Sequence, residues 1–139
     1  ASDWSSDVCS SDLLTFDDGP SDNTQKILDV LDEYGVKATF FVIGKTGDEA
    51  EERYKMIVER GHTLAMHSYT HKYSSLYASL KAFKEEIIKE TNYLEEVTGY
   101  RPWLFRFPGG SSNQVSNVSM SKLIKYLNEN VQDLCLYHI

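Results

Sequence analysis

Short apolar runs alternate along the chain with longer segments in which apolar residues recur at helical spacing. The apolar runs predict strands at residues 13–16, 37–44, 62–68, 102–107 and 131–137. The periodic segments predict helices at residues 22–34, 48–60, 79–98 and 119–129. Strands that alternate with helices of ten to twenty residues predict an α/β fold, with about five βα units around a parallel sheet or barrel.

The first thirteen residues do not follow this alternation. They are rich in serine and aspartate and show neither a helical nor a strand period, so we expect residues 1–13 to be a disordered or artefactual tail. Residues 14–139 are expected to form one domain. The net charge of −7 argues against a nucleic-acid partner. No apolar stretch approaches the ~20 residues of a membrane span, and the two cysteines, Cys9 and Cys135, have no metal-like spacing.

Polar clusters follow three of the predicted strands, at residues 17–18, 67–71 and 106–113. In folds built of βα units, ligands bind at the carboxyl ends of the parallel strands. The three clusters are therefore expected to meet in one functional site.

Asp17 and Asp18 place two like charges side by side at a strand end. Asp-Gly-Pro is turn material, which explains the glycine, the proline and one aspartate. A bound dication explains the presence of both aspartates, because it offsets the repulsion between two ionised carboxylates. One aspartate can then bind the ion while the other acts as a general base.

His67 and His71 lie four residues apart, so both imidazoles can reach one metal ion if the segment forms a helical turn. Taken alone, such a pair is more often two surface or capping histidines. An aspartate at a neighbouring strand end would supply the oxygen ligand that completes a catalytic metal site with an open position.

The segment 106–113, RFPGGSSN, combines an arginine with adjacent glycines. Arg106 can hold a carboxylate in place, and Gly109-Gly110 permits backbone conformations closed to other residues. The alternative is an ordinary loop with a surface arginine.

Taken together, TFDDGP, ATFFVIG, HSYTH and RFPGG, in this order, resemble the polysaccharide deacetylases with a NodB-homology domain, carbohydrate esterase family four. The resemblance covers roughly residues 13–130 and implies a distorted (β/α) barrel. A full barrel needs ~250 residues, so we expect a partial barrel that is incomplete at its C-terminus.

The resemblance also implies roles for individual residues. The metal ligands, for zinc or another divalent ion, would be Asp18, His67 and His71. Asp17 would be the catalytic base and Arg106 would orient it, while the backbone N–H of Gly109 would help to bind the oxyanion. An Asp-Trp pair and a later Leu-x-His with an acid histidine are further motifs of the family. No Asp-Trp pair follows the arginine loop, and the Leu-x-His at 136–138 comes too soon after Arg106, so we expect the chain to carry the base and metal site without the acid.

The expected activity is removal of N-acetyl groups from N-acetylglucosamine residues of a glycan, with peptidoglycan the first candidate and chitin oligomers the second. The alternatives are O-deacetylation of acetylated xylan and a non-catalytic carbohydrate-binding relative. Such proteins act outside the cytoplasmic membrane, so an extracellular or cell-surface location is expected for the parent protein. The sequence does not indicate an oligomeric state.

Overall fold

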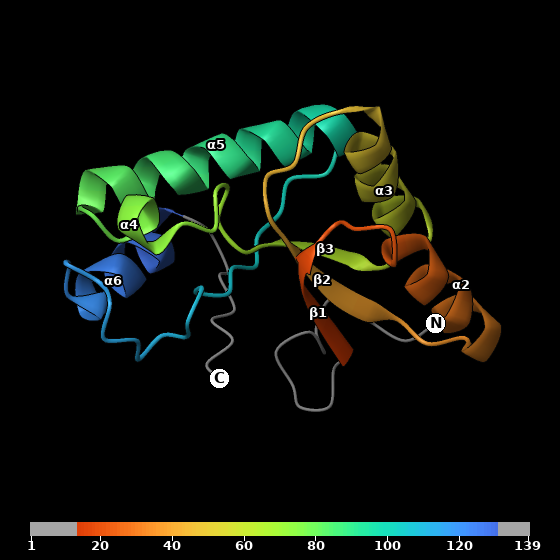
Figure 1. Cartoon of the computed structure of the whole chain (residues 1–139), viewed down its shortest axis with the longest axis horizontal. Coiled ribbons are helices and arrows are strands. Elements are labelled where there is room, and N and C mark those ends of the chain that lie inside the picture. The colour runs from red at the N-terminus through yellow and green to blue at the C-terminus, as the bar shows by residue number, and fades with distance from the viewer. Residues whose placement is uncertain (1–13, 131–139) are drawn as a thin grey trace.

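A computed structural model describes residues 14–130 of the chain (Figure 1). The strands are β1 (Leu14–Gly19), β2 (Ala38–Val42) and β3 (Thr63–Met66). The helices are α2 (Thr24–Tyr34), α3 (Asp48–Glu59), α4 (Tyr73–Leu76), α5 (Leu80–Thr98) and α6 (Met120–Asn130). The predicted alternation of strands and helices is confirmed from β1 to β3.

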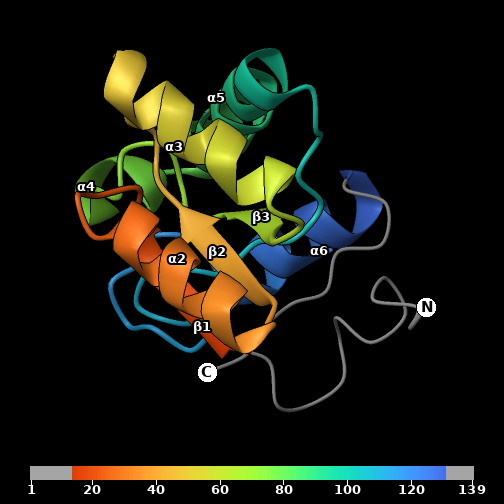
Figure 2. The same cartoon turned by 90° about the vertical axis from the view of Figure 1, so that its right-hand side faces the viewer.

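The three strands form a parallel sheet in the order β1-β2-β3, with α2 and α3 as the crossover connections (Figure 2). All five residues of the central strand β2 are buried, which explains why its sequence is an unbroken apolar run. Helix α2 ends at Gly35, which adopts the left-handed conformation with φ +63°. The sheet thus brings the carboxyl ends of its three strands to one edge.

The long helix α5 crosses the molecule and packs against α3, α4, α6 and β3 (Figure 1). Its buried stripe carries Phe83, Ile87 and Leu94, as the helical spacing predicts. The same stripe also carries Glu86 and Glu90, and both of these acidic residues are buried. Two carboxylates on a core-facing stripe are unusual and bear on the site described below.

The prediction of a fourth strand at residues 102–107 is wrong. Only a single parallel bridge joins Phe105 to Met66, flanked by hydrogen bonds from Met66 N–H to the Leu104 carbonyl (2.9 Å) and from Arg106 N–H to the Met66 carbonyl (3.0 Å). Pro102 has no N–H to donate, and the chain turns away after residue 107, so a longer ladder does not form. The predicted strand at 131–137 lies outside the described residues, and the one-turn helix α4 was not predicted.

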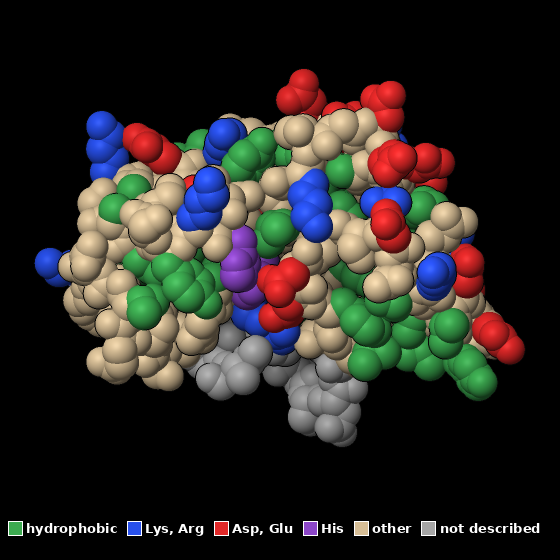
Figure 3. All heavy atoms as spheres, viewed as in Figure 1, with side chains coloured by type: hydrophobic (Ala, Val, Ile, Leu, Met, Phe, Trp, Pro, Cys, Tyr) green, Lys and Arg blue, Asp and Glu red, His purple; other side chains and the backbone are tan. Residues whose placement is uncertain are grey.

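Within the described residues β1 pairs only with β2, and an apolar groove lies between β1 and α2. Leu14 and Val30 on this groove are about half exposed, and hydrophobic side chains are visible on the same face of the molecule (Figure 3). A closed barrel has no such strand edge, so the described residues form an open part of a barrel. None of the helices in residues 14–130 has the length and apolar character needed to cross a bilayer.

Candidate metal and catalytic site

A β-bulge at the end of β1 brings both aspartates to the same side. Asp17 pairs with Phe41 and Gly19 with Val42, so Asp18 is an extra residue in the register. Asp18 has φ +69°, a left-handed conformation. In a regular strand neighbouring side chains point to opposite faces, and the bulge redirects the second one. The adjacent carboxylates can therefore face one site.

Asp18, His67 and His71 form a cluster in which one potential ligand atom from each lies within 4.8 Å of the others. Asp18 Oδ1 lies 3.2 Å from His71 Nε2 and 3.5 Å from His67 Nε2. In Figure 3, histidine, acidic and basic side chains meet near the middle of the exposed face. The side chain of Asp18 is 64% exposed and that of His71 is 31% exposed, so the cluster is open to solvent on one side, where a substrate could approach.

These distances fit a single tetrahedral ion. Zinc ligands at 2.0–2.2 Å from the metal are separated from one another by roughly 3.4 Å in tetrahedral geometry. The two carboxylate-to-imidazole distances in the structure, 3.2 and 3.5 Å, lie on either side of this value. Two imidazoles and one carboxylate are also the ligand types of catalytic zinc sites that keep an open position.

His67 is buried and held in one orientation. Its Nδ1 lies 2.7 Å from the carbonyl oxygen of Arg106, an acceptor, so Nδ1 carries the proton and Nε2 presents its lone pair to the cluster. Burial lowers the pKa of His67, although this hydrogen bond and the nearby Asp17 and Asp18 act in the opposite direction. A lowered pKa favours the neutral imidazole, the form that binds metals.

Arg106 also holds the second aspartate. Its Nη1 donates hydrogen bonds to Asp17 Oδ1 (2.6 Å) and to Thr15 Oγ1 (3.2 Å), and its guanidinium lies over the ring of Phe41, 4.1 Å from the centroid. The other carboxylate oxygen of Asp17, Oδ2, is 3.9 Å from His67 Nε2. Asp17 is thus beside the cluster and fixed by a buried cation.

The histidine loop, residues 67–71, has an unusual backbone. Ser68 (φ +76°) and His71 (φ +54°), together with Asp18, are the non-glycine residues of the described chain with positive φ. Side chains make this conformation unfavourable, and it persists where surrounding contacts impose it. All three residues belong to the candidate site, so its geometry is imposed by the fold.

Buried carboxylates on α5 supply some of these contacts. Glu86 accepts hydrogen bonds from Thr70, and Glu90 accepts one from the N–H of His67 (3.3 Å). Desolvation raises the pKa of Glu90 well above its ordinary value. Neither residue was among the predicted site residues, although a polar position on the apolar stripe of 79–98 was a usable signal.

Gly109 lies against Tyr73 in the structure. A Cβ at Gly109 would lie 3.2 Å from the Tyr73 hydroxyl, and Gly109 has φ +78°, so a glycine suits the position. The ring of Tyr73 is in turn 5.9 Å from that of His71, centroid to centroid. The 106–110 loop therefore reaches the rim of the cluster through Tyr73, a residue outside the predicted catalytic and metal-binding set.

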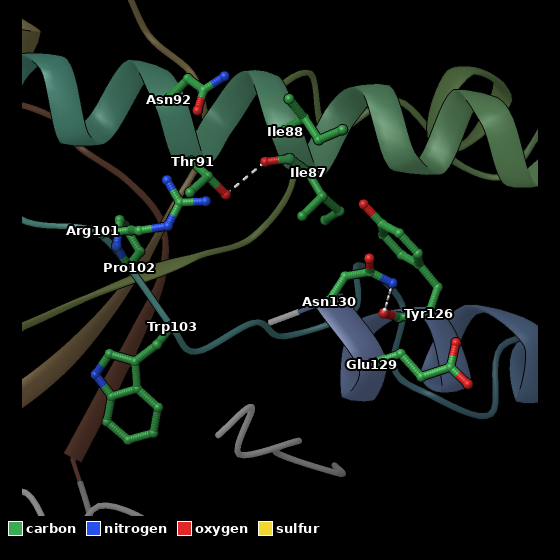
Figure 4. Close-up of a pocket in the computed structure, with 10 residues that line it drawn as sticks. All are labelled: Ile87, Ile88, Thr91, Asn92, Arg101, Pro102, Trp103, Tyr126, Glu129 and Asn130. Carbon is green, nitrogen blue, oxygen red and sulfur yellow. Dashed lines mark hydrogen bonds between the residues drawn. The ribbon is translucent and has the colours of Figure 1, made fainter. Parts of the chain in front are cut away.

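A separate hollow of about 510 Å³ lies between α5, residues 101–103 and α6 (Figure 4). Its lining includes Ile87, Trp103 and Tyr126, and none of the cluster residues. Its charged lining residues are Arg101 and Glu129, whose side chains come from different elements. The Asp-His-His cluster is thus distinct from this hollow.

Known proteins resemble the chain over most of its described length. A model of the polysaccharide deacetylase family matches residues 8–127. A peptidoglycan-N-acetylglucosamine deacetylase of Bacillus cereus is 38% identical over 98 residues, which cover 70% of this chain and 35% of the relative. A bifunctional xylanase/deacetylase of Pseudobutyrivibrio xylanivorans is 51% identical over 59 residues, or 42% of this chain and 10% of the relative.

A solved structure, the catalytic domain of a peptidoglycan N-acetylglucosamine deacetylase from Eubacterium rectale, superposes with a TM-score of 0.82 at 41% identity. The match covers 89% of this chain and 57% of that one. The chain therefore spans less than two thirds of the length of these relatives. The family match and the fold lead to one conclusion: the chain belongs to the polysaccharide deacetylase family, the NodB-type deacetylases of carbohydrate esterase family four.

Proposed function

We propose that the protein containing this chain is a metal-dependent N-deacetylase that hydrolyses the acetamide of N-acetylglucosamine residues, with peptidoglycan as the substrate. The observation that carries this proposal is the convergence of Asp18, His67 and His71 on one point beside the Asp17–Arg106 pair. Hydrolysis adds one water across the amide and yields acetate and a free amino sugar.

Asp18 Oδ1 and the Nε2 atoms of His67 and His71 would hold the metal, and zinc fits this set of donors. A bound divalent ion supplies a Lewis acid that polarises a carbonyl oxygen and makes water more acidic. Arg106 and the bulge at Asp18 contribute by fixing the donors before substrate arrives. Such preorganisation avoids reorganisation during the reaction.

Asp17 would be the general base. Arg106 occupies its Oδ1, which leaves Oδ2 directed toward the cluster, where a water could lie between base and substrate. The arginine also keeps the carboxylate in one orientation, so that its proton-accepting oxygen stays in place. The backbone N–H of Gly109 is the proposed oxyanion donor.

The choice of peptidoglycan follows the names of the relatives from Bacillus cereus and Eubacterium rectale. The xylanase/deacetylase relative favours one second candidate, removal of O-acetyl groups from xylan by the same site. We also propose an extracellular or cell-surface location for the whole protein, because peptidoglycan lies outside the cytoplasmic membrane.

The full-length protein that contains this chain provides the test. We expect it to release acetate and free amines from N-acetylated peptidoglycan, and the Asp17→Asn variant to bind zinc normally while its rate falls by at least about 100-fold. Faster acetate release from acetylated xylan, without new amines, would favour the second candidate. No release from either substrate by a zinc-loaded protein would favour a non-catalytic carbohydrate-binding relative.

A further inference from the structure

Glu86 of α5 makes contacts with the histidine loop that the proposed mechanism does not use. We propose that Glu86 is a positioning residue for the metal site, whose carboxylate fixes the turn that carries His71. This inference rests on the proposed function, since it assumes that His71 binds a metal ion. The argument starts from the contacts of the carboxylate itself.

The carboxylate of Glu86 accepts three hydrogen bonds. Thr70 donates two of them, from its N–H to Oε2 (2.9 Å) and from its hydroxyl to Oε1 (2.8 Å), and the Ser75 hydroxyl donates the third (3.2 Å). Glu86 is 7% exposed, so water competes little for these bonds. Thr70 immediately precedes His71, and Ser75 lies in α4 just after it. The Glu86 carboxylate thus binds residues on both sides of His71 in the sequence.

The backbone of this turn needs such support. Ser68 and His71 have φ values of +76° and +54°, and each costs on the order of 1 kcal/mol relative to an ordinary conformation. The Ser68 hydroxyl accepts a hydrogen bond from the N–H of His71 (3.0 Å), which closes the turn locally. Glu86 anchors the same turn to α5 from outside, because Thr70 lies between the two strained positions.

The other end of the loop is held separately. Glu90, one helical turn further along α5, accepts the N–H of His67, which also donates to the Val42 carbonyl of β2 (2.8 Å). The two carboxylates therefore act at different ligands. Loss of Glu86 should therefore loosen His71 while His67 stays in place. Metal affinity then reports the role of Glu86 more directly than the stability of the fold does.

The test measures the zinc dissociation constant of the full 139-residue chain by competition with a chromogenic chelator. Glu86→Ala should weaken zinc binding by roughly 10- to 100-fold, the range found when groups that orient metal ligands are removed. Glu86→Gln should stay within about 3-fold, because an amide can accept the Thr70 N–H and donate to the two hydroxyls. Glu85→Ala is the matched control, since Glu85 is on the same helix with a 67% exposed side chain and should leave affinity unchanged.

A second control, Ile57→Val, distinguishes ligand positioning by Glu86 from a general loss of stability. It removes one methyl group from a fully buried side chain on α3. It should lower the melting temperature of the metal-free chain without changing zinc affinity. Equal zinc affinity in a folded Glu86→Ala variant and in the unaltered chain would overturn the positioning role. So would a loss of affinity in Ile57→Val as large as that in Glu86→Ala.

If Glu86→Ala does not fold, Thr70→Val decides, because it keeps the carboxylate and removes one donor to it. Weaker zinc binding by folded Thr70→Val supports the proposal, and unchanged binding overturns it. No zinc binding by the unaltered chain would instead overturn the metal site of the proposed function, and the positioning role with it. The two failures are therefore distinguishable.

Discussion

The carbonyl oxygen of Arg106 lies 2.7 Å from Nδ1 of His67 and so determines which imidazole nitrogen faces the candidate metal site. The guanidinium of the same arginine donates to Asp17 Oδ1 at 2.6 Å. One residue thus orients a candidate ligand through its backbone and the candidate base through its side chain. Substitution of the side chain should separate these two effects.

We expect Arg106→Gln to lower the free energy of unfolding by about 1–3 kcal/mol, because it removes a buried charged donor from Asp17 and Thr15. Zinc affinity should change far less, since the backbone carbonyl that orients His67 remains. Denaturant unfolding and zinc titration measure the two quantities. The control is Arg101→Gln, whose exposed pair with Glu95 should contribute less than about 1 kcal/mol. An equal effect of the two substitutions would rule out a special role for Arg106.

Gly44 is the second position at which the structure makes a sharp prediction. A Cβ there would clash with the ring of Tyr69, and that ring is confined by Lys89, 4.1 Å from its centroid, and by Tyr93. We expect Gly44→Ala to destabilise the chain by about 1–3 kcal/mol through overpacking. Thermal or denaturant unfolding gives the value.

Combining Gly44→Ala with Tyr69→Ala separates this clash from other effects. Removal of the ring frees the space, so the alanine at 44 should cost much less in the Tyr69→Ala background. Simple addition of the two effects would show that the clash is not the cause.

His62 gives a prediction for the pH dependence of stability. It is buried, and its Nδ1 accepts the N–H of Ala38 (3.2 Å). Burial lowers the pKa of His62, as do the charges of Lys37 and Arg60, while Asp32 acts to raise it. In the unfolded chain the imidazole returns to its ordinary pKa near 6.5, so between that value and the lower folded pKa the unfolded state binds more protons. Stability should therefore fall as the pH drops below about 6.5.

His62→Asn tests this directly, since the asparagine oxygen can replace Nδ1 as acceptor for Ala38 without titrating. The free energy of unfolding of the unaltered chain, minus that of the variant, should decrease between pH 6.5 and 5 with a slope of at most about 1.4 kcal/mol per pH unit. A difference that stays constant across this range would contradict the assignment.

The sequence was sufficient to predict the three strands and the helices α2, α3, α5 and α6, because apolar periodicity is a local signal. It also placed polar clusters at strand ends, where the structure brings Asp18, His67 and His71 together. It could not predict how Asp17 and Asp18 come to face one side, since that depends on a bulge that regular strand alternation does not contain. The strand prediction for residues 102–107 was wrong because an apolar run is typical of a strand. In the structure, Pro102 and the turn after residue 107 limit the pairing of this segment to one bridge. Glu86 was missed because its role depends on a tertiary contact with the histidine loop.

The central claim is that Asp18, His67 and His71 form one metal site, and zinc titration of the chain with and without its ligands tests it most directly. We predict saturable 1:1 binding by the unaltered chain, with about 2.7 kcal/mol of added stability when free zinc is 100 times its dissociation constant. Asp18→Ala and His71→Ala should each abolish this binding and the accompanying rise in melting temperature. Stoichiometric zinc retained by either variant, or a cooperatively folded unaltered chain that binds none, would contradict the account.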